Sequence, residues 1–216
     1  MIAENSSGST AIVWFRKDLR LMDNPSLHAA VSGGYKILPV FIWNPEEGGQ
    51  WSPGSASRWW IHHALKSLGT DIRKLGGELI LAKGKAGELI PQIAKDHGAE
   101  KVFYGRTYDP PGLSTQEKVE DALDRSGIDA ESFNASLLQE PWETKNGSGN
   151  PFQVFTPYWR KSRPIIYRQP VDYDPTRLCF HSSPTPKLSL DDLNLLPAYG
   201  WHQKLEDHWT VSESAA

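Results

Sequence analysis

Short apolar runs alternate along the chain with longer segments in which apolar residues recur every three or four positions. The apolar runs predict strands at residues 11–15, 36–43, 78–82 and 101–105, with a weaker fifth strand at residues 128–133. The segments between them predict helices at residues 24–33, 55–75, 86–97 and 114–125. Because the strand segments are continuously apolar, they indicate a parallel sheet covered by helices on both faces. The predicted fold class is α/β: a doubly wound, Rossmann-like, five-stranded and mainly parallel sheet.

The second predicted strand, KILPVFIW, contains Pro39. Proline lacks the backbone N–H that a ladder hydrogen bond requires, which argues against a central position in the sheet. The apolar residues on both sides of Pro39 argue for burial instead. The sequence leaves both alternatives open.

The alternation of strands and helices ends near residue 138. Residues 140–153 are turn-rich, residues 155–168 are aromatic and basic, and residues 170–197 are rich in proline and polar residues. Residues 201–209 are expected to form one or two helical turns. We therefore predict an α/β domain over residues 10–138 and a connector over residues 139–216.

Composition narrows the classes of function. A hydrophobic fraction of 38% and a charged fraction of 23% are ordinary for a soluble globular protein, and the net charge of −3 gives no overall attraction to nucleic acid or to an anionic membrane. The lone cysteine, Cys179, excludes a disulfide framework and favours a reducing compartment. No apolar run approaches the roughly 18 residues that span a bilayer, and the first nine residues lack the order of a signal peptide. We expect a cytoplasmic protein without membrane association.

Candidate binding residues lie at the carboxyl ends of three of the predicted strands or after them, at the sheet edge where doubly wound folds bind their ligands. These residues are Arg16, Phe41, Ile42, Trp43, Arg58, Thr107, Tyr108 and Asp109. Aromatic rings, an acid and arginines in one crevice suit a flat, conjugated ligand with hydrogen-bonding edges. The chain has no GxGxxG, GxxxxGK[ST] or GxSxG motif, so a dinucleotide fingerprint, a P-loop and a nucleophile elbow are unsupported. No metal site is expected, because the adjacent His62 and His63 cannot bind one ion from one helix face.

Two charged segments allow alternative interpretations. The first strand is followed by Arg16, Lys17, Asp18, Arg20 and Asp23, which either edge a binding site or brace the loop. We expect Arg16 to approach the crevice, and the two aspartates and Arg20 to form a structural clasp that meets the connector. Residues 155–168 carry four cations and no acid, so they either contact phosphates or present a solvated face beside packed aromatic rings.

Several stretches resemble the DNA photolyase and cryptochrome family, in the family's order. They are WFRKDLRLMDNPSL, SPGSASRWWIHHALKSL, VFYGRTYDP, LLQEPWETKNGSGNPFQVFTPYWR and LNLLPAYGWHQKLEDHWTVSESAA. The resemblance runs from about Thr10 to the end of the chain. It implies an N-terminal α/β domain that holds a light-harvesting antenna chromophore: methenyltetrahydrofolate, a deazaflavin or a flavin.

The resemblance also implies a second, helical domain that binds FAD and damaged DNA, and this domain is absent from the chain. The parent protein would be a deoxyribodipyrimidine photolyase, a lyase that repairs cyclobutane pyrimidine dimers with light and reduced FAD. The chain alone is expected to be inactive, with the missing domain as its partner and DNA bound only by the full-length protein. The alternatives are the matching domain of a cryptochrome photoreceptor, which signals by partner binding, or a stand-alone nucleotide- or flavin-binding module.

The resemblance assigns roles to some of the candidate residues. Residues 41–43 match the segment that walls the chromophore ring, and Arg58 matches an arginine that contacts deazaflavin-type antennae. Asp109 takes the place of an acid, usually Glu, that hydrogen-bonds the ring edge. Thr107 replaces the Asp of some deazaflavin-binding members, which weakens that assignment. We expect weak or no chromophore retention.

The missing domain should also leave aromatic side chains exposed and promote self-association. The residues expected to be exposed are Trp142, Phe155, Tyr158, Trp159, Trp201 and Trp209.

Overall fold

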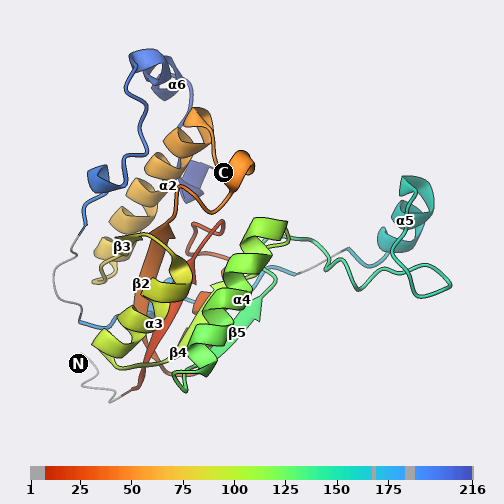
Figure 1. The fold of residues 1–216 in the computed structure, drawn as a ribbon, viewed down its shortest axis with the longest axis horizontal. Helices are drawn as coiled ribbons and strands as arrows, with labels where there is room; N and C mark the ends of the chain where they lie inside the picture. Colours follow the sequence, from red (N-terminus) through yellow and green to blue (C-terminus); the bar gives the residue numbers. More distant parts are fainter. Residues whose placement is uncertain (1–7, 167–168, 183–187, 216) are drawn as a thin grey trace.

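The computed structural model describes residues 8–166, 169–182 and 188–215 (Figure 1). Its sheet consists of β1 (Thr10–Phe15), β2 (Lys36–Trp43), β3 (Ile80–Lys83), β4 (Ala99–Gly105) and β5 (Asp129–Phe133). The strand order is β3-β2-β1-β4-β5, and every neighbouring pair is parallel. The order reverses between β1 and β4, which is where a doubly wound sheet opens a crevice at its carboxyl edge. The predicted fold class is confirmed.

Helices cover both faces of the sheet. Alternate residues of β1 point to opposite faces, so Val13 and Phe15 pack with α1 (Pro25–Ser32) and α2 (Ser55–Lys74). Ile12 and Trp14 pack on the other face with α3 (Ala86–His97) and α4 (Pro110–Asp124). Within the described part of the chain, no helix is both long and apolar enough to cross a membrane.

Local sequence signals explain where two of these helices begin and end. The Asn24 side chain accepts hydrogen bonds from the backbone N–H groups of Ser26 and Leu27, at 3.1 and 3.2 Å, and so caps α1. Gly98 ends α3 in the left-handed conformation, with φ of 61°, as glycine commonly does at this position.

The predicted start of α4 at Ser114 is wrong. The helix begins at Pro110, because Asp109 caps it by accepting a hydrogen bond from the Gly112 N–H at 3.2 Å. Proline is favoured in the first turn of a helix, where no N–H donor is required. The two prolines therefore begin the helix rather than mark a loop before it.

Pro39 lies in an interior strand, and the burial of this segment is confirmed. On the outer side of β2, β3 pairs only from Val40 onward. Earlier in β2, Ile37 bonds instead with the connector: its N–H donates to the Cys179 carbonyl at 2.7 Å, and its carbonyl accepts from the His181 N–H at 2.9 Å. Pro39 falls between these two partners, where a missing N–H breaks no ladder bond.

The connector returns to the α/β unit and contributes to its core. Leu178, Leu193 and Leu195 are buried with the residues beneath α1 and α2. The expected turns near the end of the chain are a 3₁₀ turn, Gly200–His202, and α6 (Gln203–Glu206). The division into residues 10–138 and 139–216 remains a prediction.

The other short elements lie in loops. They are the 3₁₀ turns Gly49–Trp51, Pro175–Arg177, Asp191–Leu193 and Glu213–Ala215. Helix α5 (Phe155–Ser162) stands away from the sheet at the end of an extended excursion of the chain (Figure 1).

The predicted clasp after β1 is confirmed. Arg20 Nη2 donates to the carbonyls of Asp23 and Ala135 at 2.8 and 2.9 Å, and Asp23 Oδ1 accepts from the Val171 N–H of the connector at 2.7 Å. Asp18 accepts from the Arg16 N–H at 3.0 Å, and burial raises the pKa of Asp18. These charges brace the loop before α1.

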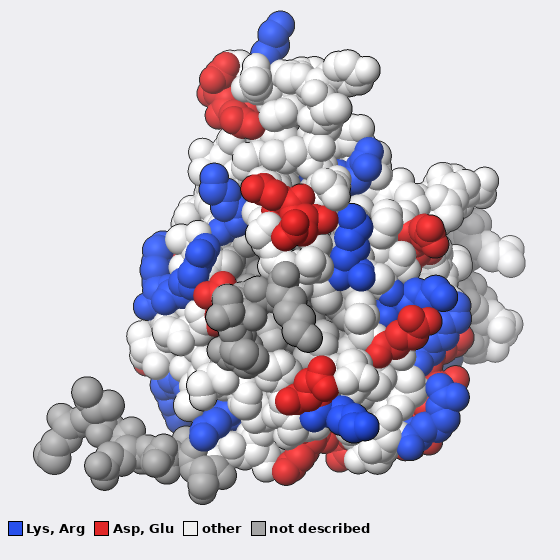
Figure 2. Space-filling model, turned by 60° about the vertical axis from the view of Figure 1, so that its left-hand side comes forward, with Lys and Arg blue, Asp and Glu red and all other residues white. Residues whose placement is uncertain are grey.

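Acidic and basic side chains are interspersed on the face shown in Figure 2. Such a surface has no extended field of one sign, in keeping with the small net charge of −3.

Candidate functional site

A cavity of about 190 Å³ lies at the carboxyl ends of β1, β2 and β4. Six of the eight predicted binding residues line it. They are Arg16, Phe41, Ile42, Trp43, Thr107 and Asp109. The strand order brings them together, because the carboxyl ends of parallel strands share one edge of the sheet.

The apolar wall comes from the end of β2, where Phe41 and Trp43 are almost fully buried. Trp14, from β1, adds a third aromatic ring to the lining. Flat aromatic surfaces of this kind favour a planar, conjugated ligand over a flexible polar one.

Arg16 places a buried cation in the cavity. Its side chain is 7% exposed, and its guanidinium carbon lies 4.4 Å from the centre of the Trp14 ring. Nη2 donates to the Gly112 carbonyl at 3.1 Å, whereas the buried Nη1 has no hydrogen-bond partner in the described part of the protein. Burial lowers the pKa of Arg16, and the Glu47 carboxylate is the strongest of the charges that oppose this.

Both carboxylate oxygens of Asp109 are already engaged. Oδ2 caps α4 through the Gly112 N–H, and Oδ1 accepts from Lys17 Nζ at 2.6 Å. Burial acts to raise the pKa of Asp109, but the hydrogen bonds and the charge of Lys17 outweigh it and hold the pKa below its usual value. Asp109 is therefore ionised, and its first roles are to begin the helix and to pair with Lys17.

Thr107 offers a polar group that, unlike Asp109, has no partner among the described residues. Its hydroxyl is buried and, in the described residues, has no hydrogen-bond partner. Gly112 allows this packing, since a Cβ at position 112 would lie 2.4 Å from Thr107 Oγ1. A buried hydroxyl gains free energy by bonding a ligand that enters the cavity.

Arg58 and Tyr108 do not line the cavity. Arg58, in the first turn of α2, reaches Ser55 Oγ with Nη2 at 3.4 Å. The Tyr108 ring lies 6.3 Å from that of Trp142, and burial, followed by the nearby Glu140 carboxylate, raises the pKa of its hydroxyl. Their proposed contacts with a chromophore would require a ligand that extends beyond the enclosed volume.

Glu47 and Gly112 also line the cavity, and neither was predicted from the sequence. Glu47 lies in a loop without periodicity, and only its place after the second strand pointed to the carboxyl edge. Gly112 precedes residue 114, where the sequence placed the start of the fourth helix. Within the described residues, no group of three or more His, Cys, Asp or Glu side chains is arranged to hold a metal ion.

The sequence of the chain is similar to those of known proteins. The DNA photolyase family profile matches residues 11–176. The deoxyribodipyrimidine photo-lyase of Agrobacterium fabrum is 37% identical over 207 residues, which cover 95% of this chain and 42% of the relative. Cryptochrome-1 of Arabidopsis thaliana is 40% identical over 163 residues, which cover 74% of this chain and 24% of the relative.

A solved structure shares the fold closely. A bacterial class III photolyase from Agrobacterium tumefaciens matches with a TM-score of 0.86 and 35% identity, covering 99% of this chain and 44% of that chain. The chain thus spans less than half the length of these relatives.

Proposed function

Because the chain belongs to the DNA photolyase family, we propose that its cavity binds the antenna chromophore of a deoxyribodipyrimidine photolyase. When bound, the chromophore would absorb light and pass the energy to an FAD held elsewhere in the full-length protein. That protein would use reduced FAD to repair cyclobutane pyrimidine dimers in DNA. The chain described here would collect light without performing the repair.

The observation that carries this proposal is the combination of groups in one small cavity. Aromatic side chains from β1 and β2 form flat walls, while the Arg16 guanidinium and the Thr107 hydroxyl supply polar groups without full partners in the described residues. A planar heterocycle with acceptor atoms at its edge satisfies both kinds of surface.

The size of the cavity limits how firmly the chromophore is held. Ligand pockets usually enclose about 300–1,000 Å³, whereas this cavity measures about 190 Å³. A methenyltetrahydrofolate, deazaflavin or flavin ring would therefore enter only when the rim opens. We propose weak retention, with the ring edge bonded first by Arg16 and Thr107, which lack full partners, and less by Asp109, each of whose oxygens already accepts one hydrogen bond.

The connector supplies the proposed contact with the rest of the protein. Phe155 and Trp159 on α5 stack at 6.1 Å and are 70% and 41% exposed, so they present an apolar surface without a partner in the described chain. We propose that this surface docks on a C-terminal FAD-binding domain and that DNA is bound only through the complete protein. The lone Cys179 supports a cytoplasmic, reducing location.

A cryptochrome photoreceptor is the second candidate, favoured by the similarity to Arabidopsis cryptochrome-1. The same antenna cavity would serve either protein. Light-dependent repair of ultraviolet-irradiated DNA by the full-length protein supports the photolyase, and light-dependent partner binding without repair supports the cryptochrome.

Titration of the purified chain with methenyltetrahydrofolate, FMN and a deazaflavin tests the antenna proposal. We expect saturable shifts in absorbance for at least one of them. Thr107→Val, which keeps the shape but removes the hydroxyl, should weaken that binding about three- to tenfold. Thr115→Val on the outer part of α4 is the matched control. The proposal fails if none of the chromophores binds, or if both variants bind like the natural chain.

A further inference from the structure

The loop between β2 and α2 places an acid over the buried Arg16. Glu47 Oε1 lies 3.5 Å from Arg16 Nη2, and the Glu47 side chain is 28% exposed whereas that of Arg16 is 7% exposed. Both residues line the cavity. The acid therefore approaches the cation from the solvent side, along the path that a ligand would take.

No other acid in the described residues forms an ion pair with this guanidinium. Asp18 accepts from the backbone N–H of Arg16, and Asp109 pairs with Lys17. A buried cation without a counter-ion is costly, so the contact with Glu47 offsets part of the cost of burying Arg16. The contact is nevertheless loose, and Nη1 remains without a hydrogen-bond partner in the described chain.

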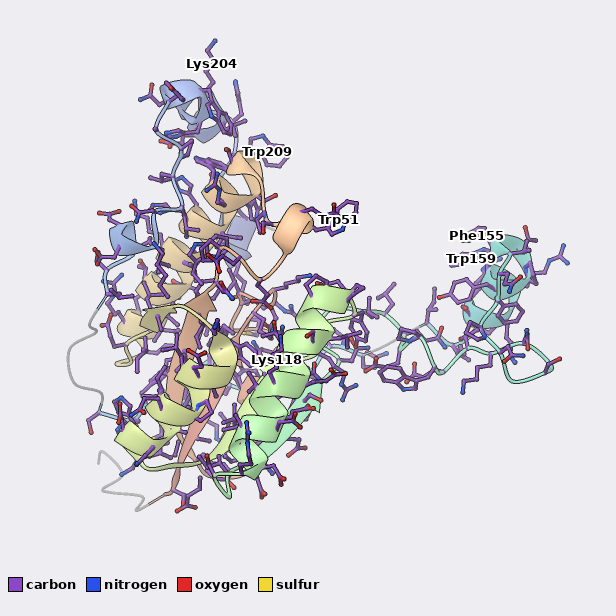
Figure 3. All side chains as sticks on the ribbon, in the orientation of Figure 1. Trp51, Lys118, Phe155, Trp159, Lys204 and Trp209 are labelled. Atoms are coloured by element: carbon purple, nitrogen blue, oxygen red, sulfur yellow. The ribbon has the colours of Figure 1, made fainter. Side chains whose placement is uncertain are left out.

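The loop that carries Glu47 is held mainly by bonds within itself. Glu46 N–H donates to Asn44 Oδ1 at 3.1 Å, Ser52 Oγ donates to the Pro45 carbonyl at 3.0 Å, and a 3₁₀ turn closes Gly49–Trp51. Among the described residues, the ion pair between Glu47 and Arg16 is the polar side-chain contact that links residues 45–53 to the end of β1. Trp51, at the end of the 3₁₀ turn, borders the cavity but is 79% exposed, so it adds little burial that would hold the loop in place (Figure 3).

We propose that Glu47 acts as the counter-ion of Arg16 when no ligand is bound. In this role it occupies the position that an anionic group of the ligand takes on binding. A ligand with a carboxylate or a comparable anionic group on a flat apolar body displaces Glu47, and residues 44–54 move outward to enlarge the cavity. Glu47 thereby selects for anionic ligands and lowers their apparent affinity. This inference rests on the proposed ligand cavity and adds the charge of the ligand and the means of its entry.

A carboxylate-rescue experiment tests the exchange without any chromophore. Glu47→Ala removes the counter-ion and leaves space beside Arg16, so sodium acetate should occupy that space. We expect acetate to raise the Tm of this variant saturably by about 2–4 °C. Sodium chloride at the same ionic strength should not do so.

Two further variants serve as controls for the rescue. Glu46→Ala removes the neighbouring acid of the same loop, which forms no ion pair with another described residue, and should show no specific acetate response. In Arg16→Gln/Glu47→Ala the cation is also gone, so the response should disappear. An acetate response that is equal in Glu47→Ala and Glu46→Ala, or that persists in the double variant, overturns the proposal.

A pair of fluorescent pterins tests the selectivity on the natural chain and on Glu47→Gln, which preserves the size of the side chain. Relief of charge repulsion should strengthen the binding of pterin-6-carboxylate to Glu47→Gln about five- to tenfold. The binding of uncharged 6-methylpterin should stay the same. Equal effects on both pterins overturn the inference and leave the ligand cavity intact. Acetate rescue without binding of either pterin supports the counter-ion role and counts against a pterin as the ligand.

Discussion

Asp109 has two carboxylate oxygens, and the fold uses both of them. One begins α4 by accepting from the Gly112 N–H, and the other pairs with Lys17 at 2.6 Å. A side chain predicted to bind a ligand, because it follows a strand, can therefore have the capping of a helix as its main role. Position alone could not distinguish a ligand contact from a cap, because an aspartate at the carboxyl edge of the sheet can serve in either role.

Two substitutions separate the roles of Asp109. Asp109→Ala removes cap and charge and should lower the free energy of unfolding by about 1–2 kcal/mol, whereas Asp109→Asn keeps a good cap and should cost about 0.5 kcal/mol. Urea denaturation at pH 7 measures both. Asp121→Asn, an exposed change within α4, should cost less than either.

The pH dependence of this stabilisation has a definite sign. The pKa of Asp109 is lower in the folded protein than in the unfolded chain, so folding favours the ionised form. The contribution is complete above the unfolded pKa of about 3.9 and is lost as the pH falls through the folded value. The difference between the natural chain and Asp109→Ala should therefore shrink on acidification below about pH 4. A difference that is constant down to pH 2.5 would contradict this account.

Elements with strong local signals could be predicted from the sequence. The periodicity of residues 55–75 and the glycine after residue 97 reflect contacts within a few residues, and α2 and α3 lie where these signals placed them. The start of α4 was missed, because the prediction began the helix at residue 114, after Pro110 and Pro111.

Long-range contacts had no such signal. Phe180 pairs with β2, and Leu193 is buried in the core, although the connector has no apolar periodicity of its own. The candidate site shows the same limit. Strand ends indicated Arg16 and Trp43, but the approach of Glu47 depends on how its loop folds back over β1.

The packing of α4 against the loop after β4 depends on Gly112. A Cβ there would lie 2.4 Å from Thr107 Oγ1 and 3.0 Å from Thr107 Cβ, so Gly112→Ala should lower the free energy of unfolding by about 1–2 kcal/mol. Gly69→Ala, in α2, is the matched control, because the nearest atom outside the helix backbone lies 3.9 Å away. Alanine should stabilise that helix by about 0.5–1 kcal/mol. Opposite signs in urea denaturation support the packing, and a gain at both positions would refute it.

The whole molecule combines a compact α/β unit with an extended segment that carries α5 and does not pack on that unit (Figure 1). Six aromatic residues expected to be exposed are indeed so, from 37% for Tyr158 to 70% for Phe155. They are Trp142, Phe155, Tyr158, Trp159, Trp201 and Trp209. Of the four cations in residues 155–168, Arg160, Lys161 and Arg163 are exposed on or beside α5, whereas Arg168 lies outside the described residues. The chain spans less than half the length of its relatives, so the proposed C-terminal domain would cover part of this surface.

Without that cover, the apolar surface of α5 should promote association between copies of the chain. Phe155 and Trp159 are stacked one helical turn apart, and they are the two most exposed aromatic rings of the helix. We predict concentration-dependent self-association in sedimentation velocity. Phe155→Ser/Trp159→Ser should weaken it at least about tenfold, since buried aromatic anchors dominate the energetics of interfaces. Trp51→Ser provides the control, because Trp51 is 79% exposed and lies in a different part of the molecule (Figure 3). A dilution-insensitive monomer, or an equal loss in the Trp51 variant, would show that α5 does not mediate association.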